Sequence, residues 1–127
     1  MIAKAKGGKV EYVDWHVGIR PVTFYSSANH TYNLRFNHHD QVVELPKNAA
    51  ILAGSPGCAI TMYQIGSNIL GMQFHPEFTE KHHKKVIDRI KNLQGFSPSQ
   101  YEIFSNEVIG KTDNAKALQV IQTFLQF

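Results

Sequence analysis

Short apolar runs fill the first part of the chain, in the pattern that is typical of β-strands. β-Branched and aromatic residues alternate with polar ones, and turn-forming residues separate the runs. The pattern predicts strands over residues 9–13, 17–24, 32–36, 49–53, 59–65 and 69–74. The Gly66-Ser67-Asn68 stretch between the last two strands predicts a hairpin.

After residue 78, apolar positions recur every three or four residues, which is the period of an α-helix. The first helix is predicted to begin after Thr79, a good N-cap, and to end near Gly95. Its inward stripe should contain Val86, Ile90 and Leu93. Residues 97–108 are predicted to be helical or irregular. A last helix is predicted to begin after a cap at Thr112 or Asp113. Its inward face should contain Ala117, Leu118, Ile121, Phe124 and Leu125.

The order of strands followed by helices indicates an α/β or α+β fold. Met1 to Lys6 has the character of a helix end, since Gly7-Gly8 is a C-terminal signal. No N-cap and no first turns precede it. A helix without its start predicts that the chain begins inside a larger fold, and the alternative is a frayed terminus.

Composition narrows the class of protein. The 127 residues fit one domain, and 43% of them are hydrophobic. A net charge of +3 is too small for a dedicated nucleic-acid binder. The single cysteine, Cys58, excludes an internal disulfide and suits a reducing compartment. With no secretory signal and no membrane-length apolar run, we expect a cytoplasmic protein without nucleic-acid or membrane partners.

The chemistry is concentrated at the end of the last predicted strand, in His75-Pro76-Glu77. Strand residues two apart point to the same side, so His75 and Glu77 should lie side by side. Pro76 cannot donate a ladder hydrogen bond, which places both side chains at the strand exit. A histidine oriented by a carboxylate activates a thiol or hydroxyl nucleophile. The alternative is a surface His-Pro-Glu held by ordinary hydrogen bonds.

The stretch from Leu70 to Thr79 resembles the His-Pro-Glu motif of class I glutamine amidotransferases, in particular of domains similar to that of GMP synthase. Three other stretches support this resemblance. They are His38-x-Asp40-x-Val42 with Leu45-Pro46, then Leu52-Ala53-x-Ser55, and the opening Ala3 to Val10. The resemblance covers Met1 to about Leu93.

The resemblance implies a Cys-His-Glu triad that hydrolyses the side-chain amide of glutamine and delivers ammonia, with His75 and Glu77 as its catalytic members. It also implies the fold: the later part of a flavodoxin-like α/β domain, with a mixed sheet and C-terminal helices. The family's Gly-x-Cys-x-Gly turn would precede Met1 and is absent here. We therefore expect residues 1–127 to be one incomplete domain, without activity in isolation.

A nucleophilic Cys58 and a histidine metal site receive less support from the sequence. Cys58 lies between two short strands, with no helix after it to lower its pKa, so we interpret it as an inert apolar residue. The seven histidines lack the His-Glu-x-x-His spacing of a metal site, and His38 and His39 should point to opposite sides of a strand. We expect no metal and no cofactor.

Three hypotheses for the function remain open. The chain is an amidotransferase domain whose substrate is glutamine and whose partner is an ammonia-accepting synthase, or a non-catalytic binding or regulatory subunit. A γ-glutamyl hydrolase relative is the third. An incomplete sheet should also expose an edge, which predicts self-association or pairing with a chain that completes it.

Overall fold

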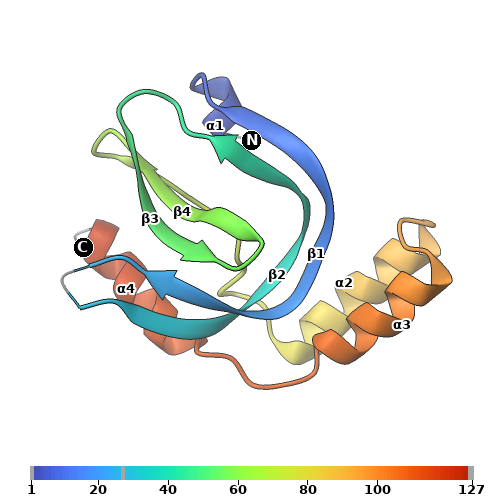
Figure 1. The fold of residues 1–127 in the computed structure, drawn as a ribbon. Helices are drawn as coiled ribbons and strands as arrows, with labels where there is room; N and C mark the ends of the chain where they lie inside the picture. Colours follow the sequence, from blue (N-terminus) through green and yellow to red (C-terminus); the bar gives the residue numbers. More distant parts are fainter. Residues whose placement is uncertain (1, 27, 126–127) are drawn as a thin grey trace.

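The computed structural model describes residues 2–26 and 28–125, and Figure 1 shows how their elements are arranged. Five strands form one sheet in the order β2-β1-β3-β4-β5. They are β1 (Lys9–Phe24), β2 (His30–Glu44), β3 (Ala49–Ser55), β4 (Cys58–Ile65) and β5 (Ile69–Met72). The helices are α1 (Ile2–Ala5), α2 (Glu80–Asn92), α3 (Pro98–Glu107) and α4 (Asn114–Leu125).

Several predicted elements are confirmed. The β4–β5 hairpin turns at residues 66–68, and the hydroxyl of Thr79 caps α2 by accepting from the backbone N–H of His82 at 3.1 Å. The segment after Ser97 is helical, and Ser97 and Gln100 form a capping box. The short helix before Gly7-Gly8 is also present, although Met1 lies outside the described residues.

The predicted strands over 9–13 and 17–24 are one strand, which corrects that expectation. The register between β1 and β2 shifts between Tyr12 and His16, and Asp14 has a left-handed φ of 82°. A bulge of this kind bends a strand without ending it. The sequence pattern breaks at the bulge, while the pairing with β2 continues on both sides.

Every described strand pairing is antiparallel, so no parallel strands of the expected mixed sheet lie among residues 2–26 and 28–125. The long strands β1 and β2 curl around the shorter ones (Figure 1). The sheet curls far enough for Phe74, two residues beyond β5, to form an antiparallel bridge with Phe36 of β2. This bridge brings the end of the β5 segment, where His75 lies, beside β2.

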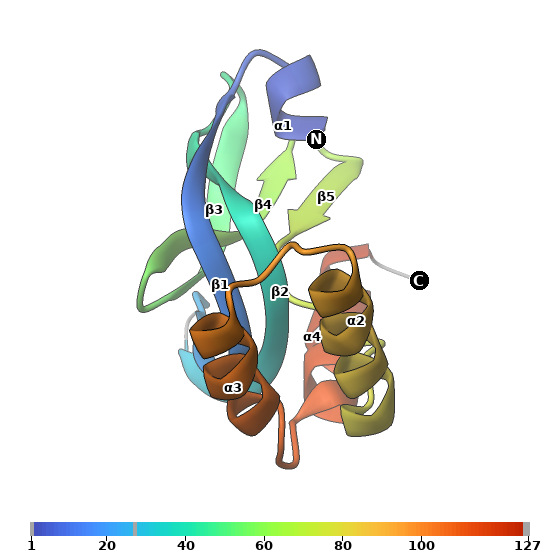
Figure 2. The same cartoon turned by 90° about the vertical axis from the view of Figure 1, so that its right-hand side faces the viewer.

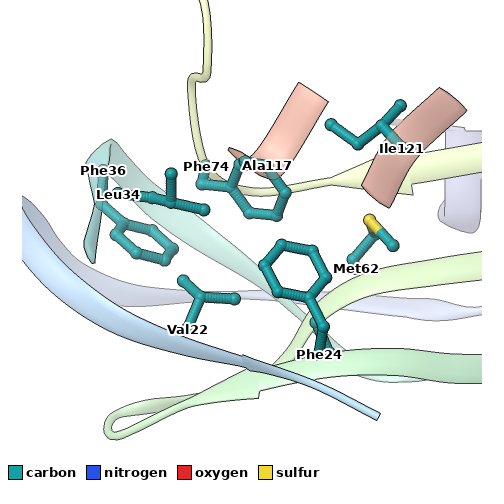
Figure 3. Close-up of a cluster of buried hydrophobic side chains, with 9 residues drawn as sticks. Val22, Phe24, Leu34, Phe36, Met62, Phe74, Ala117 and Ile121 are labelled. Atoms are coloured by element: carbon teal, nitrogen blue, oxygen red, sulfur yellow. The ribbon is translucent and has the colours of Figure 1, made fainter. Parts of the chain in front are cut away.

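The main core lies inside the curl of the sheet (Figure 3). Its aromatic residues are Phe24, Phe36 and Phe74, and α4 closes it with Ala117 and Ile121. Phe74 and Phe24 meet edge to face, with ring centroids 5.8 Å apart. Burying rings of this size contributes much of the apolar stabilisation of a domain of this length.

Helices α2 and α3 lie side by side (Figure 2), and α3 contacts β1. Their apolar residues pack on Val17 of β1 in a separate cluster. Gly18 has a φ of 120°, and a Cβ there would lie 2.9 Å from the Cβ of Glu107. Glycine at this position lets the end of α3 approach β1 closely.

The inward faces of two helices differ from prediction. In α2 the buried residues are His83 and Ile87, whereas Leu93 is 73% exposed. In α4, Ala117 and Ile121 are buried, but Leu118 and Leu125 are 46% and 42% exposed. Both helices therefore bury a narrower apolar stripe than the sequence suggests.

Candidate functional site

His75 and Glu77 lie side by side just beyond β5, as predicted, although they lie in a turn and not in an extended strand. Nδ1 of His75 lies 2.7 Å from Oε1 of Glu77, and the His75 side chain is 34% exposed. A carboxylate can only accept, so Nδ1 carries the proton when the imidazole is neutral. Nε2 then carries the lone pair, which is the arrangement of a general base.

Two further contacts fix the position of His75. Its backbone N–H donates to the carbonyl of Arg35 on β2 at 2.8 Å. Its ring stacks on Phe78, with centroids 4.2 Å apart and planes at 8°. Phe78 N donates to the carbonyl of His75 at 3.2 Å, which closes a tight turn over Pro76 and Glu77. The imidazole therefore has a defined plane as well as a defined tautomer.

Beneath this turn lies a buried basic pair, Arg35 and His83. Arg35 is 1% exposed and His83 is fully buried. Burial, followed by the charge of Arg35, lowers the pKa of His83 to about 4. His83 is therefore neutral at physiological pH, and Nδ1 can accept from the Arg35 guanidinium at 3.4 Å. Its ring centroid lies 5.3 Å from that of Phe78.

A hollow of about 300 Å³ has Gln73, Asn37 and His38 on its lining. Asn37 Oδ1, Gln73 Oε1 and His38 Nε2 are buried without a hydrogen-bond partner. Burial and the neighbouring His16 lower the pKa of His38 to about 4, and His75 adds to this effect. Trp15, His39 and Asp40 complete the lining of the hollow.

Cys58 is placed away from any activating environment. It is 1% exposed, and Sγ contacts the carbonyl of Ile60 at 3.8 Å. Burial raises the pKa of the Cys58 thiol above its ordinary value. A buried thiol with a raised pKa holds little thiolate, which is the nucleophilic form.

Other candidate ligands remain apart. His38 packs against His16 and Phe36, whereas His39 packs against Trp15 and pairs with Asp40 at 3.0 Å. Residues 2–26 and 28–125 contain no group of three His, Cys, Asp or Glu side chains with metal-site geometry. In the same residues, no helix has the length and apolar character needed to cross a membrane.

The sequence model of the family described as "Glutamine amidotransferase class-I" matches residues 2–92. The chain belongs to this family. The class I glutamine amidotransferase match includes β1 to β5, the His75-Pro76-Glu77 turn and all of α2, and it ends before α3 and α4.

Two curated relatives illustrate the range of similar proteins. γ-Glutamyl peptidase 5 of Arabidopsis thaliana is 31% identical over 107 residues, which cover 74% of this chain and 43% of the relative. A glutamine-hydrolysing GMP synthase of Chlamydia caviae is 33% identical over 99 residues, which cover 69% of this chain and 18% of the relative. The chain thus spans less than half the length of either relative.

A glutamine amidotransferase of Thermotoga maritima represents the similar solved structures. It matches with a TM-score of 0.68 at 18% identity, covering all of this chain and 59% of the solved one. Similarity at this identity shows a shared fold. It confirms that the chain has the fold of the class I glutamine amidotransferases, with C-terminal helices.

Sequence reasoning missed the residues that contact His75 besides Glu77, namely Arg35 and Phe78. Arg35 lies in an alternating strand between Leu34 and Phe36, where the pattern places it on the polar face. Nothing in the local sequence indicates that this face is covered by a segment more than 70 residues away. Phe78 directly follows His75-Pro76-Glu77 in the sequence. Its position beside the motif was the one local signal that could have marked it as a contact of His75.

Proposed function

We propose that His75 and Glu77 are the histidine and glutamate of a Cys-His-Glu triad that attacks a γ-glutamyl carbonyl. The 2.7 Å contact between His75 Nδ1 and Glu77 Oε1, at a strand exit in a family member, carries this proposal. The same contact in a protein without the family match would indicate only a surface hydrogen bond.

The residues divide the chemistry between them. His75 Nε2 takes the proton of a cysteine thiol, and the thiolate attacks the side-chain carbonyl of glutamine. The protonated His75 then gives its proton to the leaving amine, so ammonia departs and a γ-glutamyl thioester remains. Water, deprotonated by His75, hydrolyses the thioester. Glu77 fixes the tautomer and stabilises the imidazolium that forms in each step.

The thiol is the part of the triad that the 127 residues do not supply. Cys58 is buried and has a raised pKa, so it does not suit this role. We propose that residues 1–127 are one incomplete amidotransferase domain and that the nucleophile comes from a segment outside this sequence. The isolated chain should then release no ammonia from glutamine, and its physiological partner would be an ammonia-accepting synthase.

A second candidate function is hydrolysis of γ-glutamyl peptides. The 31% identity to γ-glutamyl peptidase 5 over 74% of this chain favours it. The triad chemistry is the same, and only the leaving amine differs: ammonia from glutamine, or an amino acid from a γ-glutamyl peptide. A third candidate, a binding or regulatory subunit, needs His75 and Glu77 only as structural residues.

The mass and N-terminal sequence of the protein purified from its native source test the proposal. A heavier species with Gly-x-Cys-x-Gly ahead of Met1, whose glutaminase activity His75→Gln abolishes, is the expected result. Glu102→Gln, an exposed position on α3, serves as control and should leave that activity unchanged. A native species of 14.4 kDa beginning at Met1 would instead favour the regulatory subunit.

Substrate choice separates the two catalytic candidates. The heavier species would be given glutamine and a γ-glutamyl dipeptide, and the released ammonia and amino acid would be measured. Greater kcat/KM for glutamine supports the amidotransferase. Greater kcat/KM for the dipeptide supports the peptidase.

The oligomeric state tests whether another chain covers the open edge that we expect on the incomplete sheet. We propose that the isolated chain self-associates or pairs with the chain that carries the missing strands. Light scattering should give a mass above 14.4 kDa. A clean monomer at moderate concentration would contradict self-association.

A further inference from the structure

The turn that carries His75 is held by residues 108–114, which lie beyond the family match that ends at residue 92. Nδ2 of Asn114 donates to the carbonyl of Phe78 at 2.9 Å. The backbone N–H of Gly110 donates to Oε1 of Glu80 at 2.7 Å. The connection after α3 and the first residue of α4 therefore contact Phe78 and Glu80, which lie one and three residues after the motif.

The same segment is fixed to β2. The Arg35 guanidinium donates to the carbonyl of Val108 and, at 2.6 Å, to that of Gly110. Asp113 makes two bonds with Asn33: its N–H donates to the Asn33 carbonyl at 2.9 Å, and its Oδ2 accepts from the Asn33 N–H at 2.8 Å. Residues 108–114 thus bridge β2 and the 75–80 turn.

Three contacts define the imidazole of His75, and two of them depend on this bridge. Glu77 holds Nδ1, Phe78 stacks on the ring, and the Arg35 carbonyl accepts from the backbone N–H. Asn114 restrains Phe78, and the Arg35 side chain restrains the strand segment that offers this carbonyl. Glu77 alone cannot fix the ring plane, because a single hydrogen bond leaves the ring free to tilt about it.

We propose that Asn114 and Arg35 are positioning residues for His75, which hold its imidazole in plane through Phe78 and through β2. This inference rests on the proposed function in that His75 is the base whose orientation matters. It assigns a role to the part of the chain after residue 92.

Asn114 offers the more selective test. It is the first residue of α4, and its Oδ1 accepts from the hydroxyl of Thr112 at 2.9 Å. Asn114→Asp keeps that acceptor and places a carboxylate where helix N-termini favour one. It removes only the donor to Phe78 and sets an oxygen against the Phe78 carbonyl.

The experiment is imidazole NMR of the full chain labelled with ¹⁵N-histidine, with His75 assigned by loss of its signals in His75→Gln. The Phe78 ring should shift the His75 ring protons upfield, and Phe78→Leu defines the value without stacking. In Asn114→Asp the His75 ring protons should move most of the way to the Phe78→Leu position. Asn68→Asp, in the exposed β4–β5 turn, is the charge-matched control and should leave them in place.

A structural role alone predicts a different result. Asn114→Asp would then lower the unfolding midpoint while the folded protein kept the parent His75 shifts, and this outcome would overturn the proposal. If Asn114→Asp does not fold, Asn114→Ser, which is too short to reach Phe78, should give the same displacement, and parent shifts in Asn114→Ser would overturn the proposal equally. The readout needs no nucleophile, so a failed glutaminase test leaves it intact, and a failed NMR test leaves the catalytic role of His75 untouched.

Discussion

Arg35 on β2 donates to the carbonyl oxygen of Gly110 at 2.6 Å, joining residues 75 positions apart. Arg35 is 1% exposed, and burial lowers the pKa of its guanidinium from the ordinary value. Burying a charged group costs free energy unless its donors find hydrogen-bond acceptors. Here the Arg35 guanidinium donates to the carbonyls of Val108 and Gly110. This one side chain couples the strand behind His75 to the end of α3.

Arg35→Met should therefore lower the free energy of unfolding. Each buried carbonyl left without a donor costs about 1–3 kcal/mol, and the relief of burying a charge offsets part of it, so we expect a loss of roughly 2–4 kcal/mol. Urea unfolding monitored by circular dichroism measures the change. Arg89→Met, at an exposed position of α2, is the control and should stay within about 0.5 kcal/mol. Equal midpoints for the two variants would contradict the role given to Arg35.

Glu77→Leu should change the tautomer of His75. Without an acceptor at Nδ1, the neutral ring gains nothing from carrying its proton there, and the Nε2–H form should become the major one. Glu77→Gln retains an oxygen acceptor and is the matched control, which should keep the Nδ1–H form. The ¹⁵N shifts of the His75 ring report the ratio directly. An unchanged ratio in Glu77→Leu would mean that the 2.7 Å contact does not set the tautomer.

Cys58 should react slowly in the folded protein. Burial raises the pKa of its thiol and blocks access, and both effects reduce alkylation by iodoacetamide. Intact-mass measurements over time should show little labelling in buffer and complete labelling in urea. Cys58→Ser places a hydroxyl in the same buried position and should cost about 1–3 kcal/mol of stability. Rapid labelling of the native chain would reopen Cys58 as a candidate nucleophile.

Stability should fall as the pH drops from 6.5 to 4. The folded-state pKa values of His38 and His83 are lowered to about 4 from an ordinary 6.5, so over this interval the unfolded chain binds protons that the folded chain does not. Each group then contributes a slope of up to about 1.4 kcal/mol per pH unit. The stabilisation is present above the unfolded-state pKa and is lost as the pH falls.

Urea midpoints across this pH range measure the slope. His83→Asn retains an acceptor for Arg35 but does not titrate, and it should flatten the dependence. A slope as steep as that of the parent chain would show that His83 is not one of the groups responsible.

The local elements were predicted well where the sequence carries a local cause. Thr79 caps α2 because its hydroxyl reaches a backbone N–H group within one turn. His75 and Glu77 meet as predicted, but they do so in the turn that Phe78 N–H closes on the His75 carbonyl and not through strand alternation. The inward faces of α2 and α4 were only partly predicted, since Leu93, Leu118 and Leu125 are exposed. Which apolar positions of a helix are covered depends on its tertiary neighbours, which periodicity does not encode.

The sequence by itself determined the strand and helix content, the hairpin before the motif and the pair of residues that can act as base and orienter. These follow from interactions between residues a few positions apart. The tertiary structure alone decided that Phe74 bridges Phe36, that Arg35 is buried and that Asn114 holds Phe78. Those contacts join residues 36 or more positions apart, and they form only because the curled sheet and the 108–114 segment bring the partners together when the core is buried.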